Sequence, residues 1–275
     1  MPARPSPDHE LTAAGLLIVN ADDWGRDTWT TDRILECVAP GAVSAVSAMV
    51  FMQDSERAAG IAQERGVEAG LHLNFTTPFT GAGLPRQLAG RQQQVSSYLR
   101  RHRLAPYVFN PRLTAAFEYL VAAQLDEYRR LYGTDPAHID GHHHMHLCAN
   151  VLAARLLPAG AFVRRNFCFE PGEKSVWNRL YRGAVDRVLA RRHRQTDLFF
   201  SLEPLEPLTR IERICSLARR AVVELETHPV QPDEYRFLRE AGILRHAPDL
   251  RVAPHSAVLP EWPTVNQPAH HRHAT

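Results

Sequence analysis

Residues 15–25 have the sequence GLLIVNADDWG, a short apolar run that leads through Asn20 and Ala21 to two aspartates, a tryptophan and a glycine. The aliphatic and β-branched residues predict a buried strand, and the acidic pair and Gly25 predict a polar loop at its carboxyl end. In the next segment, TTDRILECVAPG (30–41), apolar residues recur at helical spacing up to a Pro-Gly stop. A strand followed by a helix is the repeating unit of parallel α/β folds.

The same alternation continues along the chain. Further strands are expected at 42–51, 67–76, 138–140, 161–167 and 221–230, and further helices at 54–66, 111–133, 150–157, 209–220 and 234–242. Residues 77–112 are interpreted as an excursion or lid, and 168–207 are only weakly patterned. Alternating strands and helices predict a parallel sheet, and the absence of GxGxxG and P-loop motifs favours a barrel. The expected fold class is α/β, a distorted (β/α) TIM-like barrel in a single domain.

The chain length and composition set the domain limits. The 275 residues are 44% hydrophobic and 23% charged, which is ordinary for a globular protein with a substantial core. We assign residues 15–253 to one barrel domain and residues 1–14 to a flexible N-terminus. Residues 254–275 are rich in proline and histidine and are expected to form a loosely ordered tail.

Net charge and cysteine use bear on partners and compartment. A net charge of +2 provides no electrostatic argument for nucleic acid or an anionic membrane as partner. No run approaches 18 apolar residues, so no membrane span is expected, and the first 15 residues lack the apolar core of a signal peptide. The four cysteines are scattered without CxxC spacing, which is typical of a reduced, cytoplasmic protein. The oligomeric state, including a homodimer, stays open.

Polar side chains cluster at four expected strand ends, where parallel α/β folds build their sites. The clusters are Asp22 and Asp23; His72; the histidine-rich stretch HIDGHHHMHL (138–147) with Asp140, His142, His143, His144 and His146; and Glu226 with His228. Taken singly, each cluster has a purely structural interpretation. The aspartates could cap a helix, His72 could be a half-buried histidine, and the histidine stretch and His228 could lie in solvated loops. Together they favour a metal site. On a strand, residues 142, 144 and 146 would share one face and His143 would point away. The four histidines therefore cannot all bind one ion, so some must orient, shield or bind substrate.

One carboxylate and two imidazoles leave coordination positions open, which is the arrangement of a catalytic metal site. A metal held in this way lowers the pKa of water and polarises a carbonyl group. A second carboxylate could accept a proton and a histidine across the site could donate one. Such a set suits hydrolysis of an amide or an ester. Cys148, next to the histidine stretch, is an alternative thiolate ligand.

The segments LLIVNADDWG, GAVSAVSAMV, GLHLNFT, HIDGHHHMHL and ELETHP occur in this order over residues 15–230. In these segments the chain resembles the YdjC-like carbohydrate deacetylase family, which includes chitooligosaccharide deacetylases and hopanoid-biosynthesis deacetylases. The resemblance implies a barrel-like fold and metal-dependent removal of an N-acetyl group from an amino sugar or its glycoconjugate. It also implies one divalent metal ion, Zn²⁺ or Mg²⁺.

The resemblance implies roles for individual residues. Asp23, His72 and His142 are expected to bind the metal. Asp22 is expected to act as general base, although the two aspartates could exchange roles, and His228 as general acid.

The remaining candidates contact substrate or orient the ligands: Trp24, Asp140, His144, His146, Arg164 and Glu226. Arg164 is expected to pair with the base carboxylate or with substrate. Trp24 stands where the family more usually has Phe, a change that could alter stacking on a sugar. Tyr98, Tyr107, Trp177 and Tyr181 are further candidates for stacking on sugar rings.

Two other functions stay open. Paired carboxylates with histidines also suit a metal-dependent phosphoesterase, which would need two metal ions about 4 Å apart. A sugar-binding or metal-binding module without turnover would keep the histidine cluster but would not need Asp22 and His228.

Overall fold

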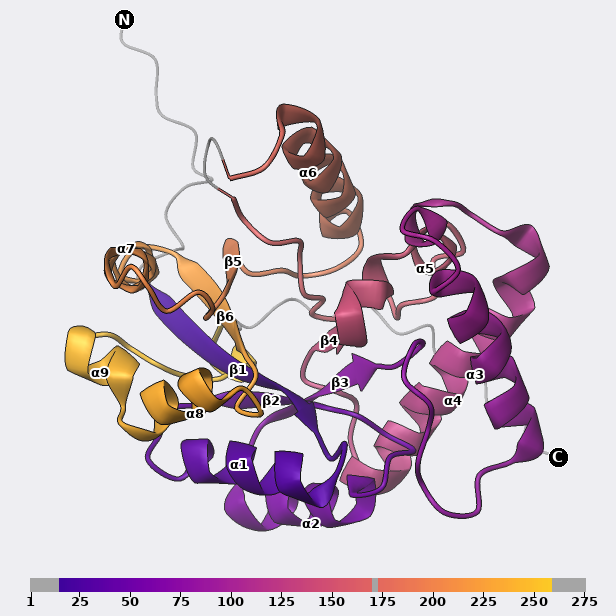
Figure 1. Ribbon diagram of the computed structural model, residues 1–275, viewed down its shortest axis with the longest axis horizontal. Helices are drawn as coiled ribbons and strands as arrows, with labels where there is room; N and C mark the ends of the chain where they lie inside the picture. Colours follow the sequence, from indigo (N-terminus) through magenta and orange to yellow (C-terminus); the bar gives the residue numbers. More distant parts are fainter. Residues whose placement is uncertain (1–14, 170–172, 259–275) are drawn as a thin grey trace, which may run out of the picture.

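The computed structural model describes residues 15–169 and 173–258 of the chain. The expected flexible N-terminus and residues 259–275 of the expected tail lie outside the described residues. Six strands form one sheet: β1 (Leu16–Trp24), β2 (Ala45–Ala48), β3 (Ala69–Leu73), β4 (Ile139–Gly141), β5 (Leu198–Ser201) and β6 (Val222–Thr227). Their order is β4-β3-β2-β1-β6-β5, and every hydrogen-bonded pair is parallel (Figure 1).

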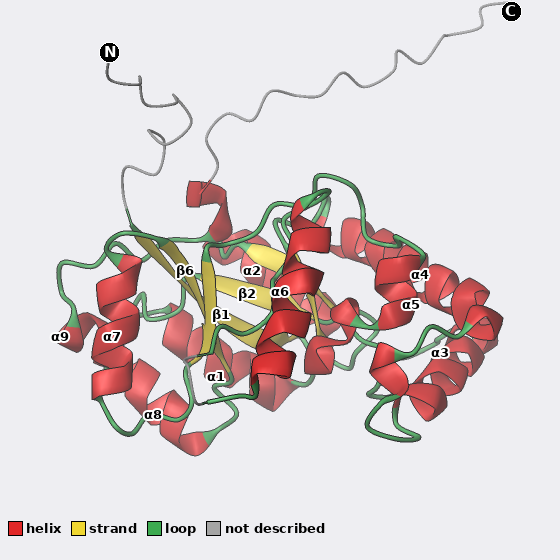
Figure 2. Cartoon of the chain, turned by 90° about the horizontal axis from the view of Figure 1, so that it is seen from above, coloured by secondary structure: helices red, strands yellow, loops and turns green. Residues whose placement is uncertain are grey.

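Helices cover the outside of this curled sheet (Figures 1 and 2). They are α1 (Thr28–Val38), α2 (Ser55–Arg65), α3 (Arg86–Leu99), α4 (Thr114–Tyr132), α5 (Ala149–Ala153), α6 (Val176–Ala190), α7 (Thr209–Ala218), α8 (Pro232–Arg239) and α9 (Gly242–His246). Four short 3₁₀ segments are η1 (Ala105–Tyr107), η2 (Pro111–Leu113), η3 (His142–Leu147) and η4 (His255–Val258). The single α/β domain predicted from the sequence is confirmed.

Strand β1 forms the centre of the sheet, as its composition predicts. All nine of its residues are buried, and it pairs with β2 on one side and β6 on the other. The helix that follows begins where the side chain of Asp27 accepts a hydrogen bond from Thr30 N at 2.8 Å, a standard N-cap. Because all strands are parallel, every carboxyl end lies at the same edge of the sheet. The polar residues that follow the strands are therefore brought together.

The barrel is distorted between β4 and β5, where regular strand pairing stops. Ile139 of β4 donates to Phe162 O at 2.8 Å, and Arg164 N donates back to Ile139 O at 3.1 Å. Farther along the same segment, Cys168 N donates to Phe199 O of β5 at 2.9 Å. The irregular segment 161–168 thus connects both sheet edges by hydrogen bonds, and this connection places Arg164 inside the curved sheet.

Three elements differ from the sequence-based expectation. The expected excursion at 77–112 contains α3, and the weakly patterned region 168–207 contains α6 and β5. Helix α6 has apolar residues on more than one side, three arginines and an internal glycine, Gly183, so the spacing of its buried side is easily missed. Strand β5 has only four residues, too few to show a period.

Residues 254–258 also differ from the loosely ordered tail that the sequence suggested. Leu17 N donates to Arg251 O at 2.9 Å and Ala253 N donates to Leu17 O at 3.1 Å, so the chain lies along β1 just before this point. It then forms η4, in which His255 is only 1% exposed. Within the described residues, no helix is both long and apolar enough to cross a membrane.

Candidate metal and catalytic centre

The two adjacent aspartates at the end of β1 point in different directions. The register between β1 and β2 shifts between Ala21 and Trp24, and Asp23 has a φ of 70°. A positive φ is strained for a non-glycine residue, and such strain collects at functional sites. The distortion turns Asp22 toward the interior of the barrel and Asp23 toward His142.

Three side chains from three elements meet at the carboxyl edge of the sheet. Asp23 Oδ1 lies 3.0 Å from His142 Nδ1 and 3.5 Å from His72 Nε2. One ligand atom from each of these residues lies within 4.8 Å of the other two. Residues expected from the sequence to bind the metal are thus neighbours in space, although 119 positions separate Asp23 from His142 (142 minus 23).

The donor set fits a divalent cation. Asp23 Oδ1 is buried and accepts no hydrogen bond of good geometry among the described residues, although His142 Nδ1 lies 3.0 Å away, so this oxygen is available to a cation. Its other oxygen accepts a hydrogen bond from Arg26 at 3.0 Å. Burial alone would raise the pKa of Asp23, but His142 and His72 hold it well below its usual range. An ionised carboxylate beside two imidazole nitrogens is a ligand set that Zn²⁺ accepts.

Asp140 orients His72 from behind. Its Oδ1 lies 2.8 Å from His72 Nδ1, which directs His72 Nε2 toward Asp23. Its Oδ2 accepts a hydrogen bond from Ser47 Oγ at 2.6 Å. A carboxylate on the far nitrogen of a histidine is the usual support of a metal ligand. Although burial opposes it, Asp140 and Asp22 raise the pKa of His72 to about 9.

Arg164 is the most heavily paired side chain of the site and is fully buried. It forms a fork on Asp22, with Nη1 2.7 Å from Oδ2 and Nη2 2.8 Å from Oδ1. It also contacts Asp140 Oδ2 at 2.6 Å, Glu224 Oε1 at 2.7 Å and Glu226 Oε1 at 3.1 Å. The arginine therefore pairs with the candidate base, and at 1% exposure it has no access to substrate.

Burial would favour the protonated form of Asp22, but Arg164 and His72 hold its pKa well below the usual range. The neighbouring carboxyl responds in the opposite way: burial and Asp22 raise the pKa of Glu226 well above its usual range. The pKa values of these two nearby acids are thus shifted in opposite directions, which is the pattern expected where a site divides proton transfer between groups.

His228 follows β6 and lies on the open side of Asp22. Its Nε2 is 4.0 Å from Asp22 Oδ2, and a third of its side chain is exposed. Its backbone N–H donates to Glu234 Oε2 at 2.5 Å, which attaches the loop to α8. The imidazole is held near the candidate base while remaining accessible from solvent.

The histidine stretch does not continue as a strand, and this corrects the expectation that 142, 144 and 146 share a face. His143 and His144 have φ values of 54° and 57° and break the extended path. The tight turn needs Gly141, because a Cβ there would lie 2.9 Å from His146 N. Only His142 points at the Asp23 group.

The other three histidines take separate positions. His143 Nδ1 lies 2.9 Å from Thr76 Oγ1, and His144 Nε2 lies 3.7 Å from Glu226 Oε1. His146 is buried, with Nε2 3.0 Å from Arg164 O, so it supports the backbone of Arg164 and has no access to substrate. Burial lowers the pKa of His146 to about 4 and that of His144 to about 3, so both are neutral at ordinary pH.

Two sequence-based suggestions are wrong. Trp24 cannot stack on a sugar, because it is fully buried and its Nε1 donates to Ala58 O at 3.1 Å. Cys148 belongs to none of the candidate metal groups among the described residues, and burial raises the pKa of its thiol to about 11.

Three polar residues behind the site were not predicted from the sequence: Asn20, Ser47 and Glu224. Asn20 donates to Asp22 Oδ1 and to Ser47 Oγ, both at 2.8 Å. Glu224 accepts from Arg164 and lies two positions before Glu226 on β6, so both glutamates face the interior. That two-residue spacing of acids within an apolar strand was the signal that could have identified Glu224.

A second buried polar cluster lies beyond Arg164, toward the amino ends of the strands. His255 Nε2 is 3.9 Å from Glu224 Oε2, and His255 Nδ1 is 3.7 Å from Glu68 Oε1. The His255 ring stacks on that of His138, with centroids 3.8 Å apart. Burial would lower the pKa of His255, but the two glutamates raise it. His255 therefore lies between two glutamates and links η4 to the Arg164 network.

Replacing His255 with glutamine is expected to lower the free energy of unfolding by about 3 kcal/mol at pH 6, because the buried Glu224 and the partly buried Glu68 lose the imidazole that they share. The raised pKa of His255 means that its contribution is complete below 6.5 and is lost as pH rises through the folded-state value. Urea unfolding of both proteins should therefore show a smaller difference at pH 9 than at pH 6.

His246→Gln provides the matched control, since His246 is exposed at the end of α9. It should shift unfolding by less than about 0.5 kcal/mol at either pH. An equal difference at pH 6 and pH 9 for the His255 variant would contradict the assignment of a buried imidazolium.

A cavity of about 500 Å³ opens beside the histidine turn. His143 and His144 form one wall, and Tyr107 and Tyr181 contribute aromatic rings with centroids 5.5 Å apart. Tyr107 and Tyr181 are thus placed where a sugar could stack. Trp177 and Tyr98 are not part of the cavity lining.

These features define the class: an α/β protein with a distorted parallel barrel whose carboxyl edge has a carboxylate–histidine centre. The family model for YdjC-like proteins matches residues 16–256, and the chain belongs to that family.

Individual relatives extend the comparison. A carbohydrate deacetylase of Mus musculus is 29% identical over 182 residues, which cover 63% of this chain and 56% of the relative. A chitooligosaccharide deacetylase of Enterobacter sp. (strain 638) is 32% identical over 133 residues, covering 48% and 50%. The matches thus span about half the length of these relatives.

A solved structure from Enterococcus faecalis V583, described provisionally as a cellobiose-phosphate cleavage protein, has the same fold. It has a TM-score of 0.63 at 17% identity and covers 90% of this chain and 99% of its own. At this level of identity the match supports the fold alone.

Proposed function

We propose that the protein is a carbohydrate N-deacetylase that hydrolyses the acetamide of an N-acetylated amino sugar or its glycoconjugate with one divalent cation. The main support is the group of Asp23, His72 and His142, whose buried oxygen Asp23 Oδ1 accepts no hydrogen bond of good geometry among the described residues. The names of the two curated relatives support the same reaction. A cytoplasmic location is part of the proposal.

Asp23, His72 and His142 would hold the cation, and two imidazole nitrogens favour Zn²⁺ over Mg²⁺. When bound, the cation supplies Lewis-acid stabilisation of the acetamide carbonyl and makes water more acidic. Asp22 accepts the proton of the attacking water, and Arg164 keeps this carboxylate ionised and correctly oriented. His228 donates a proton to the departing amine nitrogen, which yields acetate and the free amino sugar.

The arrangement disfavours a two-metal phosphoesterase. Two further groups of possible ligands adjoin the first: Asp22 with His72 and Asp140, and Asp22 with Glu226 and His228. The guanidinium of Arg164 already lies against both aspartates, 2.6 Å from Asp140 and 2.7 Å from Asp22. Arg164 occupies the second of these groups as well, because its Nη1 lies 3.1 Å from Glu226 Oε1. A cation at either position would have to displace a fully buried arginine, so one metal ion is expected.

The proposal is tested by measuring acetate release from a panel of N-acetylated amino sugars and glycosides, with Zn²⁺ or Mg²⁺ added to chelator-treated protein. Phosphate release from sugar phosphates is measured in parallel. Acetate release that depends on the metal is expected. Phosphate release without acetate would support the phosphoesterase, and bound metal with neither product would support a binding module.

His228→Gln is the informative variant in this assay. Losing the proton donor should lower kcat on the best substrate about a hundredfold, while metal content stays at one equivalent because His228 is outside the Asp23 group. Full turnover in this variant would refute the assignment of His228 as general acid. The deacetylase activity itself would still be tested by the release of acetate.

A further inference from the structure

Exposed hydrophobic side chains are concentrated on one side of the molecule. Among the described residues, eleven large hydrophobic side chains are exposed, and all but Trp29 and Leu208 lie on residues 104–109 or on α6. Trp177 is 82% exposed and Leu180 is 59% exposed. Helix α6 therefore has a second apolar face directed away from the barrel, and monomeric proteins rarely expose such contiguous apolar surface without a partner.

The two segments form one surface, here called the α6 face. The rings of Tyr107 and Tyr181 are in contact, with centroids 5.5 Å apart, and both line the 500 Å³ cavity. The same cavity is bounded by His143 and His144. Two of the exposed apolar residues, Tyr107 and Tyr181, thus line the cavity beside the candidate metal centre, and the others lie on the same two segments. In Figure 2, α6 lies in front of the sheet, which leaves its outer side uncovered.

Positive charge accompanies the apolar residues. Residues 69–117 contain six arginines and neither Asp nor Glu. Residues 174–194 contain six arginines and Lys174 against one acid, Asp186, whose carboxylate pairs with Arg165 at 3.2 Å. The whole chain has a net charge of only +2, so this charge is local and is hidden in the overall composition.

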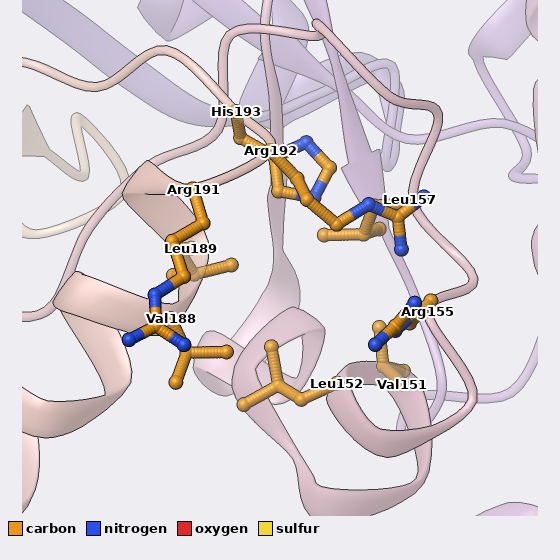
Figure 3. A pocket seen from close by; sticks show the side chains of 9 residues that line it. All are labelled: Val151, Leu152, Arg155, Leu157, Val188, Leu189, Arg191, Arg192 and His193. Atoms are coloured by element: carbon orange, nitrogen blue, oxygen red, sulfur yellow. The ribbon is translucent and has the colours of Figure 1, made fainter.

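A groove beside the end of α6 also combines apolar side chains with arginines (Figure 3). Its volume is about 280 Å³, and Val151, Leu157 and Leu189 contribute to an apolar floor. The guanidinium groups of Arg155 and Arg192 stand around these side chains in Figure 3. An apolar floor with cationic groups at its rim suits an amphiphile that has an anionic head group.

We propose that the α6 face binds the surface of an anionic lipid bilayer. A helix that combines exposed Trp and aliphatic residues with arginines is suited to lie in the membrane interface, with its apolar side in the acyl boundary and its arginines at anionic head groups. Nucleic acid would use the arginines but would leave Val176, Leu180 and Val188 unpartnered. The inference concerns the surface alone and does not depend on the deacetylase activity. Binding through the α6 face would place the 500 Å³ cavity next to the bilayer.

The test is co-sedimentation of the full chain with vesicles of phosphatidylcholine alone or of phosphatidylcholine mixed with phosphatidylglycerol. Binding to the anionic vesicles that weakens with salt is expected. The double variant Trp177→Asp, Leu180→Asp should weaken binding more than tenfold, because it removes apolar area and adds negative charge. Arg187→Gln and Arg191→Gln should each weaken it roughly fivefold.

Trp29→Asp is the matched control. Trp29 is 57% exposed on α1, away from α6 in Figure 1, and its variant should bind vesicles like the wild type. Absence of binding to anionic vesicles at low salt would overturn the proposal. So would light scattering that shows a dimer dissociated by the double variant without vesicle binding, or binding to an oligonucleotide in place of vesicles.

Discussion

His142→Ala is expected to lose its bound divalent cation and at least about a thousandfold in acetate release. The magnitude follows from the several kcal/mol that a catalytic metal contributes, since about 4 kcal/mol corresponds to a factor of about a thousand. Metal content by mass spectrometry and turnover should fall together. Thermal unfolding of the metal-free protein should change only modestly, because His142 loses one close contact, to Asp23 at 3.0 Å, and the other oxygen of that carboxylate stays hydrogen-bonded to Arg26.

The choice of His142 over His72 makes the result easier to interpret. His72 is fully buried against Asp140, so its removal would also leave a buried carboxylate without its partner. His143→Ala is the matched control, since His143 is the next residue of the same turn but faces Thr76. It should keep one equivalent of metal. Full metal content and full activity in His142→Ala would show that the cation is bound elsewhere.

Arg164→Met is expected to abolish folding at 25 °C. The substitution leaves Asp22, Asp140 and Glu224 buried close together without their shared cation. Removing one partner of a buried ion pair costs about 3–5 kcal/mol, and several pairs are broken here against a total stability of about 5–15 kcal/mol. Soluble yield and far-ultraviolet circular dichroism report the result.

Arg164→Lys keeps the prediction measurable if the methionine variant does not fold. Lysine retains the charge but cannot form the planar fork on Asp22 while also reaching Glu224, so a loss of about 3 kcal/mol in urea unfolding is expected. Arg165→Met is the control, because Arg165 is partly exposed and its pair with Asp186 should contribute about 1 kcal/mol or less. Near wild-type stability of Arg164→Met would show that these carboxylates are protonated or hydrated in the fold.

Much of the fold could be predicted because local patterns are strong where strands are fully buried. Strand β1 begins with four consecutive apolar residues, 16–19, and α4 has regular helical spacing that ends at Gly133. Helix α6 could not be recognised in the same way, because its outer apolar face and its basic residues obscure the period of its buried side. Helix α3, within the expected excursion or lid at 77–112, was not recognised for a similar reason: its glutamine-rich sequence has few apolar positions.

The residues of the candidate site could likewise be predicted from the sequence only in part. Asp23, His72 and His142 could be proposed because each follows a strand and all parallel strands end at one edge. The turn after Gly141 was not foreseen, since residues with positive φ leave little trace in composition when they are histidines. Burial of Trp24 was likewise invisible beside two polar neighbours.

Alternating apolar and polar segments were sufficient to predict a parallel barrel and the edge where polar side chains meet, because strand period and strand ends depend on neighbouring residues. The partners of Arg164 depend on the three-dimensional path of the chain. Its four carboxylates come from β1, β4 and β6, and His255 joins them from a segment expected to be a loose tail. These contacts arise where an irregular segment connects the two edges of the sheet, and their geometry follows from that connection and from no local pattern.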